Sequence, residues 1–178
     1  MQTPPSSNGS FTESIVAFLR DNQYLADPLV FLLGFAEGVP VVSLFVPSSA
    51  LFVAIGSMQG AFGGSFISLW LSATVGAILG DLVTYGIGRY FKDNAQRVWP
   101  LSRRPELLIK GRKLIERWGI LAILGGKFLG FMRPFLPITA GVMEMNFVIF
   151  CIASVLSSLA WSGVFLAPGF GLGQFAGP

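Results

Sequence analysis

Five charged side chains lie inside or beside strongly apolar segments of this chain. They are Glu37, Asp81, Lys127, Arg133 and Glu144. A charge at the centre of a lipid bilayer costs ~2.5–3.5 kcal/mol, so the first four, if unpaired, would cost on the order of 10–14 kcal/mol. We therefore expect these four to be paired or to have a function. Glu144 directly precedes the last apolar segment, and we expect it at the membrane interface.

Two interpretations of the four embedded charges remain open. In the structural one, Glu37 and Asp81 form ion pairs with Lys127 and Arg133 that hold the apolar segments together. In the functional one, the two bases present positive charge to an anionic head group while the two acids bind and release protons. An arginine suits a phosphate because its planar fork donates two parallel hydrogen bonds, and a lysine adds a point charge. Both interpretations can hold at different stages of a transport cycle.

Four prolines interrupt the apolar segments that hold these charges, and we interpret them as helix breakers. They are Pro40, Pro47, Pro134 and Pro137. A helix that begins after such a break has unpaired N–H groups at its N-terminus, which can hold an anion. Ser48 and Ser49 follow one break and are expected either to cap the next half-helix or to line a substrate cavity. We group both serines with the candidate substrate-binding residues.

The residue types that are missing exclude several classes of chemistry. The chain has no histidine and one cysteine, Cys151. A Ser/His/Asp triad, a histidine-based metal site and an internal disulfide are therefore excluded. We expect a protein that is not an enzyme and has no catalytic residue, metal or cofactor.

The composition indicates a membrane protein with a basic cytoplasmic segment. Hydrophobic residues make up 53% of the 178 residues and charged residues 12%, whereas soluble domains have roughly a quarter charged. Nine of the 12 lysines and arginines lie between Arg89 and Arg117 with three acids, so this segment has a net charge of +6. The positive-inside rule places it in the cytoplasm. Anionic lipid explains the charge better than nucleic acid.

The pattern of apolar runs, breaks and charges divides the chain into seven segments. We expect a tail with a short amphipathic helix (1–27), a broken hairpin (28–60), a transmembrane helix (66–90), a basic cytoplasmic segment with an interfacial helix (91–118), a second broken hairpin (119–141), a second transmembrane helix (147–166) and a C-terminal tail (174–178). The predicted fold class is an all-α integral membrane protein with two re-entrant broken-helix hairpins, each followed by a transmembrane helix. Repetition of this order is typical of transporter folds, whose broken helices form the substrate site.

Small residues recur at every fourth position of the first predicted transmembrane helix. They are Ser72, Gly76, Gly80, Thr84 and Gly88. Such a ridge lets another helix approach closely, so we expect a helix to pack against it.

Four stretches together resemble the DedA family of membrane proteins, whose members share the VTT domain. They are FAEGVP (35–40), VPSSAL (46–51), GAILGDLVTYGIGR (76–89) and GKFLGFMRPFLPITAG (126–141). The resemblance covers residues 28–173. It implies two oppositely facing re-entrant hairpins packed with spanning helices, and movement of lipids between leaflets. The implied substrates are undecaprenyl phosphate or phosphatidylethanolamine, with proton coupling through acidic residues.

The resemblance assigns roles to individual positions and also exposes departures. Glu37 matches the family's first acidic position, and Arg133 matches one of its arginines. Ser49 stands where many members have an acid, and Lys127 stands where many have an arginine. A proton relay through two carboxylates is then retained only if Asp81 takes the place of the second acidic residue.

Two shorter stretches are similar to a branch of the family that is sometimes fused to a PA-phosphatase-type domain. They are RPELL (104–108) and LAPGFGLG (166–173). Such a phosphatase requires histidine, and this sequence has none.

The leading hypothesis is a multi-pass lipid translocase of the bacterial cytoplasmic (inner) membrane. Its partners would be membrane lipids and protons, without nucleic acid, and a homo-oligomer is left open. The alternatives are a proton-coupled transporter of a small solute and a structural membrane module that transports nothing.

Overall fold

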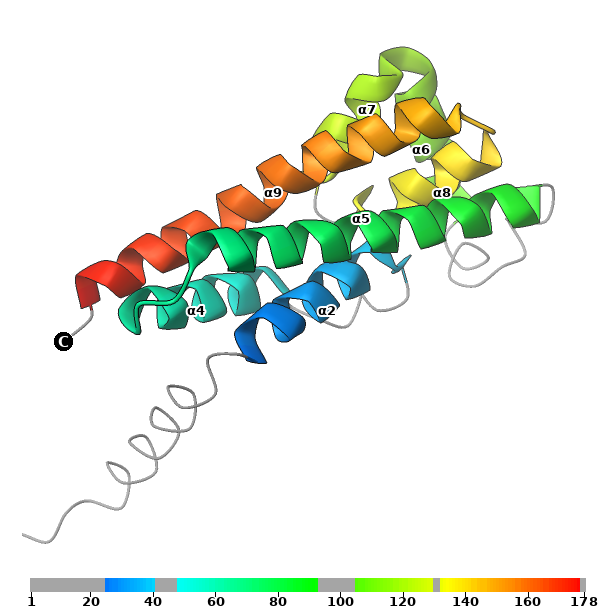
Figure 1. The fold of residues 1–178 in the computed structure, drawn as a ribbon. Helices are drawn as coiled ribbons and strands as arrows, with labels where there is room; N and C mark the ends of the chain where they lie inside the picture. The colour runs from blue at the N-terminus through cyan, green and yellow to red at the C-terminus, as the bar shows by residue number, and fades with distance from the viewer. Residues whose placement is uncertain (1–24, 41–47, 93–104, 130–131, 177–178) are drawn as a thin grey trace, which may run out of the picture.

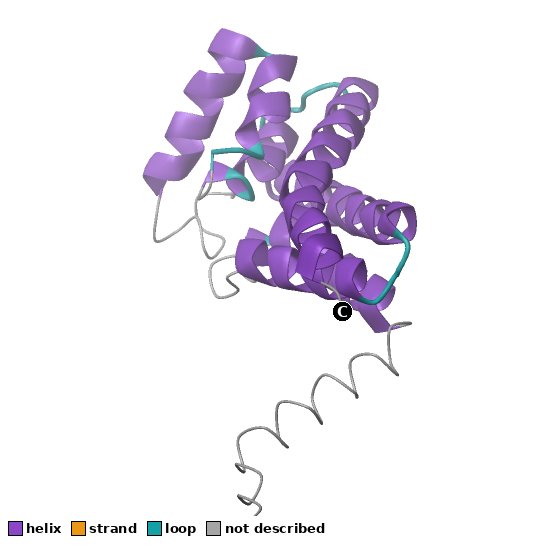
Figure 2. Ribbon diagram, turned by 90° about the vertical axis from the view of Figure 1, so that its left-hand side faces the viewer, coloured by secondary structure: helices purple, strands orange, loops and turns teal. Residues whose placement is uncertain are grey.

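The computed structural model describes residues 25–40, 48–92, 105–129 and 132–176, and within these ranges every regular element is a helix (Figures 1 and 2). The helices are α2 (Ala26–Gly38), α4 (Ser48–Ala61), α5 (Phe66–Phe91), α6 (Pro105–Trp118), α7 (Ile120–Gly126), α8 (Phe135–Val142) and α9 (Phe147–Ala176). The prediction of an all-helical fold is confirmed for this part of the chain. The amphipathic helix predicted near the N-terminus lies in residues 1–24, outside the described ranges.

Two of these helices, α5 and α9, are long and apolar enough to cross a membrane. The first matches the span expected at 66–90, but α9 continues through Pro168 to Ala176, beyond the expected end at 166. A proline removes one helical hydrogen bond, yet neighbouring helices make this tolerable in membrane proteins. Here α4 packs closely on the last turns of α9, where a Cβ on Gly169 would lie 2.3 Å from the carbonyl oxygen of Val53.

The two broken segments each form a pair of short helices. In the first, α2 ends just before Pro40 and α4 begins just after Pro47. In the second, α7 ends at Gly126, and α8 begins just after Pro134. Pro137 does not break a helix, contrary to expectation: it lies in the first turn of α8, where its missing N–H needs no intrahelical partner.

The α5 and α9 helices form a frame for the short helices. In Figure 1, α2 and α4 lie against one half of this frame, and α6, α7 and α8 lie around the other half. The ridge of small residues on α5 faces two of them. A Cβ on Gly76 would lie 2.1 Å from the carbonyl oxygen of Phe31 in α2, and a Cβ on Gly88 would lie 2.1 Å from that of Ile138 in α8. The predicted close helix approach is confirmed.

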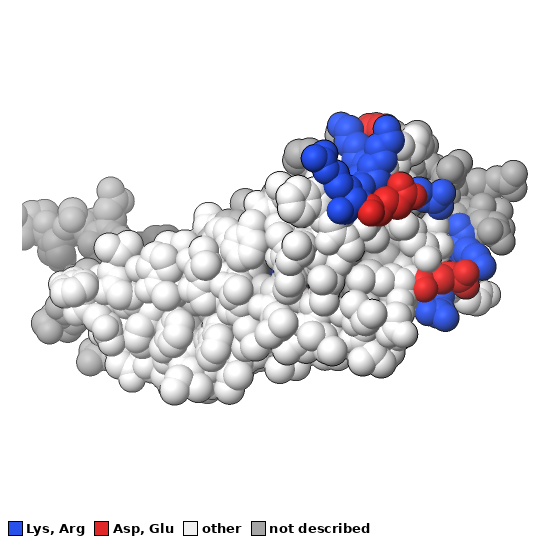
Figure 3. Space-filling view, turned by 90° about the horizontal axis from the view of Figure 1, so that it is seen from above, with Lys and Arg blue, Asp and Glu red and all other residues white. Residues whose placement is uncertain are grey.

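The basic helix α6 is amphipathic, as predicted. Leu107, Leu108 and Ile115 are buried, with the first two packed in a cluster that includes residues of α8. The lysines and arginines of α6 are exposed, and Figure 3 shows the charged side chains of this face gathered at one end of the molecule. Among the described residues, the remainder of the visible face has no Lys, Arg, Asp or Glu side chain, which fits a lipid environment.

Candidate functional site

The fold brings the four embedded charges together in the interior. Glu37 lies near the end of α2, Asp81 in the middle of α5, Lys127 just after α7 and Arg133 just before α8. Each side chain is at most 7% exposed. The α2 and α5 backbones meet beside both acids, because a Cβ on Gly38 would lie 2.8 Å from the amide nitrogen of Asp81. The carboxylates therefore come from adjacent, tightly packed helices.

Arg133 and Glu37 form the first buried ion pair, through Nη1 and Oε2. The face of the guanidinium lies over the ring of Trp161, with Cζ 3.6 Å from the ring centroid. Among the described residues, neither Nε nor Nη2 of Arg133 has a hydrogen-bond partner. A buried donor without a partner costs about 1–3 kcal/mol, more for a charged group. The guanidinium is thus paired on one side, stacked on its face, and open to a further acceptor.

Lys127 and Asp81 form the second buried ion pair, and its contacts are more complete. Nζ lies 2.7 Å from Oδ2 of Asp81 and donates to Oγ of Ser158 at 2.5 Å. The hydroxyl of Ser154 donates to the same carboxylate oxygen at 2.6 Å. This network stabilises both charges without a ligand.

One face of α9 contacts three of the four charged residues. Ser154, Ser158 and Trp161 follow one another at intervals of four and three residues, which places them on the same side of a helix. Ser162 extends this polar face and shares a hydrogen bond of 2.8 Å with Thr74 of α5. None of these positions was among the site residues predicted from the sequence. The detectable signal was a set of hydroxyls at helical spacing within an apolar span.

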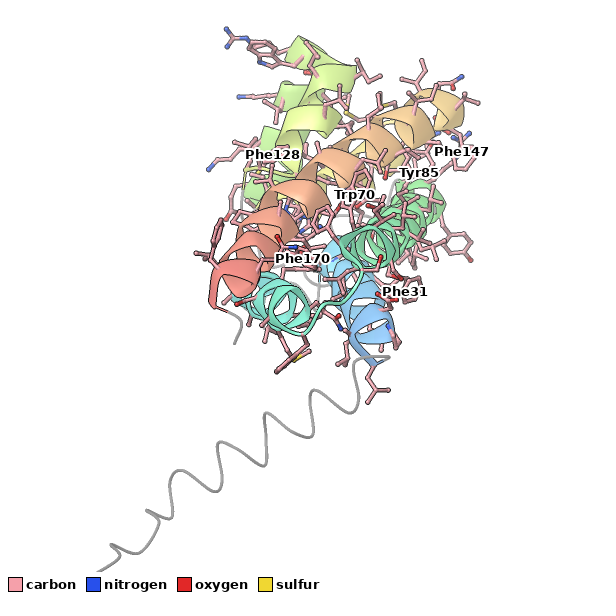
Figure 4. All side chains as sticks on the ribbon, turned by 60° about the vertical axis from the view of Figure 1, so that its left-hand side comes forward. Phe31, Trp70, Tyr85, Phe128, Phe147 and Phe170 are labelled. Carbon is pink, nitrogen blue, oxygen red and sulfur yellow. The ribbon has the colours of Figure 1, made fainter. Side chains whose placement is uncertain are left out.

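Aromatic side chains pack between α5 and α9 on either side of the polar face. Figure 4 shows Trp70 and Tyr85 on α5, the helix beside α9. Trp70 donates from Nε1 to the carbonyl oxygen of Leu159 at 3.0 Å. Tyr85 stacks on Phe150, with ring centroids 4.4 Å apart, and contacts Phe147. These contacts fix the separation of the two long helices around the charges.

The remaining predicted site residues lie at the margins or outside the described part of the chain. Helix α4 begins at Ser48. The side chains of Ser48 and Ser49, and the whole of Pro47, lie outside the part of the chain that the structure describes. Glu144, which was expected at the membrane interface and not in the site, is exposed in the turn between α8 and α9 and pairs with Lys92 at 2.7 Å. A hydrogen bond and the positive charge of Lys92 hold the pKa of the Glu144 carboxyl below its usual value.

Comparison with known proteins identifies the family. The family model of the VTT domain matches residues 46–171, a region that includes Asp81, Lys127, Arg133 and the polar face of α9. The chain belongs to the VTT-domain (DedA) family. The recognition based on the sequence motifs is confirmed.

Relatives of this VTT-domain protein are named as membrane proteins. The inner membrane protein YabI of Escherichia coli is 29% identical over 140 residues, which cover 79% of this chain and 55% of YabI. The inner membrane protein YqjA of the same bacterium is 29% identical over 166 residues, covering 87% of this chain and 74% of YqjA. The membrane protein BU139 of Buchnera aphidicola is 28% identical over 155 residues, covering 87% and 60%.

BU139 and YabI are both longer than the region that matches this chain. This chain spans between 55% and 60% of the length of BU139 and YabI. No solved structure matches the chain. The family, the relatives and the two long apolar helices together identify a VTT-domain membrane protein.

Proposed function

We propose that this VTT-domain protein moves an anionic lipid between the leaflets of the bacterial cytoplasmic membrane. The observation that carries the proposal is the pair of buried donors, Nε and Nη2 of Arg133, for which the described residues supply no acceptor. A phosphate offers two oxygens to such an edge, in the geometry that arginine binds best. Undecaprenyl phosphate is the first proposed substrate, and a phospholipid such as phosphatidylethanolamine, whose zwitterionic head group contains an anionic phosphate, is the second.

The broken helices provide the route in this proposal. The α2/α4 and α7/α8 pairs are assigned as hairpins that re-enter the membrane from opposite sides and meet at the buried charges. Broken helices at membrane depth are tolerated where they are buried in protein or line a wet cavity. A lipid head group would cross at this meeting point while its chains stay in the hydrocarbon.

Protons provide the coupling in this proposal. Glu37 and Asp81 each neutralise one base in the structure described here. Protonation of a carboxylate removes a negative charge beside its partner base, so that base attracts a phosphate more strongly. Loss of that proton restores the ion pair and favours release of the lipid. Glu37 thus stays beside Nη1 of Arg133 throughout, and its charge sets how strongly the open edge holds the phosphate.

A structural role for the charges is the second candidate, and one observation favours it. The Asp81–Lys127 pair is completed by Ser154 and Ser158 and needs no ligand. A pair whose only role is to hold helices together would have such a complete set of contacts. The two candidates differ in the transport activity that they predict for a variant without the Glu37–Arg133 pair, in which both residues are replaced by alanine.

Liposome transport separates these candidates. The purified protein is reconstituted with fluorescent undecaprenyl phosphate, and movement between leaflets is followed by a membrane-impermeant quencher. We expect Arg133→Ala to abolish movement, Glu37→Gln to reduce it nearly as far, and Arg133→Ala with Glu37→Ala to remain inactive. Arg117→Ala removes an exposed base of α6 and is the matched control, with activity retained.

The double substitution decides between the two roles. If the pair were only structural, removing both charges would also remove the cost of leaving one charge unpaired, and activity would return. Recovery of transport in the double variant, at normal yield of folded protein, would overturn the proposed phosphate-binding role. Absence of movement of any phospholipid or polyprenyl phosphate in the unmodified protein would remove lipid translocation altogether.

A further inference from the structure

The guanidinium of Arg133 is held on two sides by different helices. Glu37 of α2 holds Nη1 by an ion pair. Trp161 of α9 covers one face, with its ring centroid 3.6 Å from Cζ. A cation over an indole ring in a desolvated position gains about 2 kcal/mol or more. Rotation of the guanidinium out of this position would lose both contacts, so its orientation is constrained.

The ring of Trp161 is itself fixed by packing. Its side chain is 1% exposed. Phe52 of α4 meets it edge to face with centroids 4.9 Å apart, and Phe165, one turn further along α9, lies 5.2 Å away. A rigid ring of this kind provides a defined surface for a charged group.

The two contacts leave one edge of the guanidinium unused. Nε and Nη2 share that edge and donate in parallel, and both are buried without a partner among the described residues. We propose that Trp161 is a positioning residue which, together with Glu37, presents the Nε–Nη2 edge of Arg133 to two oxygens of a lipid phosphate. This inference rests on the proposed function and deepens it by naming the residue that orients the phosphate-binding group.

The proposal limits the chemistry of the ligand. Two parallel donors are satisfied by two oxygens on one phosphorus atom, and a head group with a single hydroxyl leaves one buried donor without an acceptor. A lysine in place of Arg133 would keep the charge but lose the fork. The site should therefore select a lipid phosphate over the corresponding lipid alcohol, and it should need arginine at this position.

Binding of farnesyl phosphate to the purified full chain in dodecyl maltoside tests the proposal, with farnesol as the matched ligand that lacks the phosphate. We expect the unmodified protein to bind farnesyl phosphate and not farnesol. Trp161→Leu removes the ring and should weaken binding about tenfold to thirtyfold. Trp161→Phe keeps an aromatic face and should restore most of the affinity. Arg133→Lys should abolish binding.

A matched variant separates positioning from packing. Phe52→Leu removes a buried ring that packs on Trp161 and belongs to the same hydrophobic cluster, but it leaves the indole beneath Arg133. Its cavity should lower the thermal unfolding midpoint as Trp161→Leu does, while affinity for farnesyl phosphate stays within about twofold of the unmodified value.

The fluorescence of Trp161 gives a second measurement, in which the Trp161 ring itself stays in place. Replacing the other three tryptophans by phenylalanine leaves Trp161 as the one indole of the chain. Saturation with farnesyl phosphate should change its emission, because the charge that lies on the ring is then shared with the phosphate. Arg133→Lys in this background should abolish the change.

The outcomes distinguish failure of this inference from failure of the proposed function. If Trp161→Leu binds farnesyl phosphate as the unmodified protein does while Arg133→Lys does not, positioning by Trp161 is overturned and phosphate binding by Arg133 stands. If Phe52→Leu loses affinity to the same extent as Trp161→Leu, the ring has only a packing role. If the unmodified protein does not discriminate between farnesyl phosphate and farnesol, both proposals fail.

Discussion

Oδ2 of Asp81 lies 2.7 Å from Nζ of Lys127, although the first residue lies in the middle of a long apolar helix and the second directly follows a short one. Both side chains are buried, and Ser154 and Ser158 of α9 complete their hydrogen bonds. This pair joins three helices at one point. It therefore connects α5, α9 and the end of the α7 segment in the interior.

Removal of one member of this pair should destabilise the protein more than removal of both. Lys127→Met leaves a buried carboxylate without its counter-ion and should cost about 3–5 kcal/mol. Asp81→Asn combined with Lys127→Met should cost less than Lys127→Met alone, and therefore less than the sum of the two single changes. Thermal unfolding of the purified variants in detergent measures this coupling. Additivity to within about 0.5 kcal/mol would show that the two charges do not interact.

Close packing of α5 on α8 should make Gly88 intolerant of a methyl group. A Cβ there would lie 2.1 Å from the carbonyl oxygen of Ile138, so Gly88→Ala should destabilise the protein by at least about 1–3 kcal/mol. Gly86 is the matched control in the same helix, because a Cβ there meets nothing within 4 Å. Gly86→Ala should be neutral or stabilising by up to about 1 kcal/mol. Equal unfolding midpoints for the two variants would contradict the close approach of these helices.

The turn between α8 and α9 should show a pH response through Glu144. Its hydrogen bond with Lys92 lowers the pKa in the folded protein, so the stabilisation exists above the unfolded pKa and is lost as pH falls through the folded pKa. Lys92→Gln should raise the pKa of Glu144 toward its ordinary value. Carboxyl ¹³C shifts of labelled glutamate report this titration, with Lys110→Gln on exposed α6 as a control. An unchanged Glu144 titration in Lys92→Gln would refute the contribution of this pair.

The basic segment around α6 should face the cytoplasm. Its concentration of lysine and arginine follows the positive-inside rule, so a single reporter cysteine introduced as Ser102→Cys in a Cys151→Ser background should be protected from impermeant maleimide in intact cells. Permeabilised cells provide the positive control for labelling. Efficient labelling of intact cells would invert the topology.

The sequence was sufficient to predict the membrane class, the helical fold and the four charged residues embedded in the apolar segments. These follow from local properties: apolar runs of sufficient length, prolines that interrupt helices, and charges whose burial in lipid would be costly. The same reasoning placed α5 and the basic helix α6, because each has its own periodic pattern. The tertiary structure was not needed for these conclusions.

Only the tertiary structure decided which acid pairs with which base. Glu37 lies with Arg133 and Asp81 with Lys127, a choice set by the rotation and separation of four helices rather than by any local pattern. Trp161 became visible as a partner of Arg133 for the same reason. The continuation of α9 through Pro168 also depends on the tertiary structure. The local sequence would interrupt the helix at this proline, and close packing of α4 against this part of α9 makes the interruption tolerable. Contacts between residues distant in sequence depend on how completed helices pack, and a single sequence does not encode that packing in any one segment.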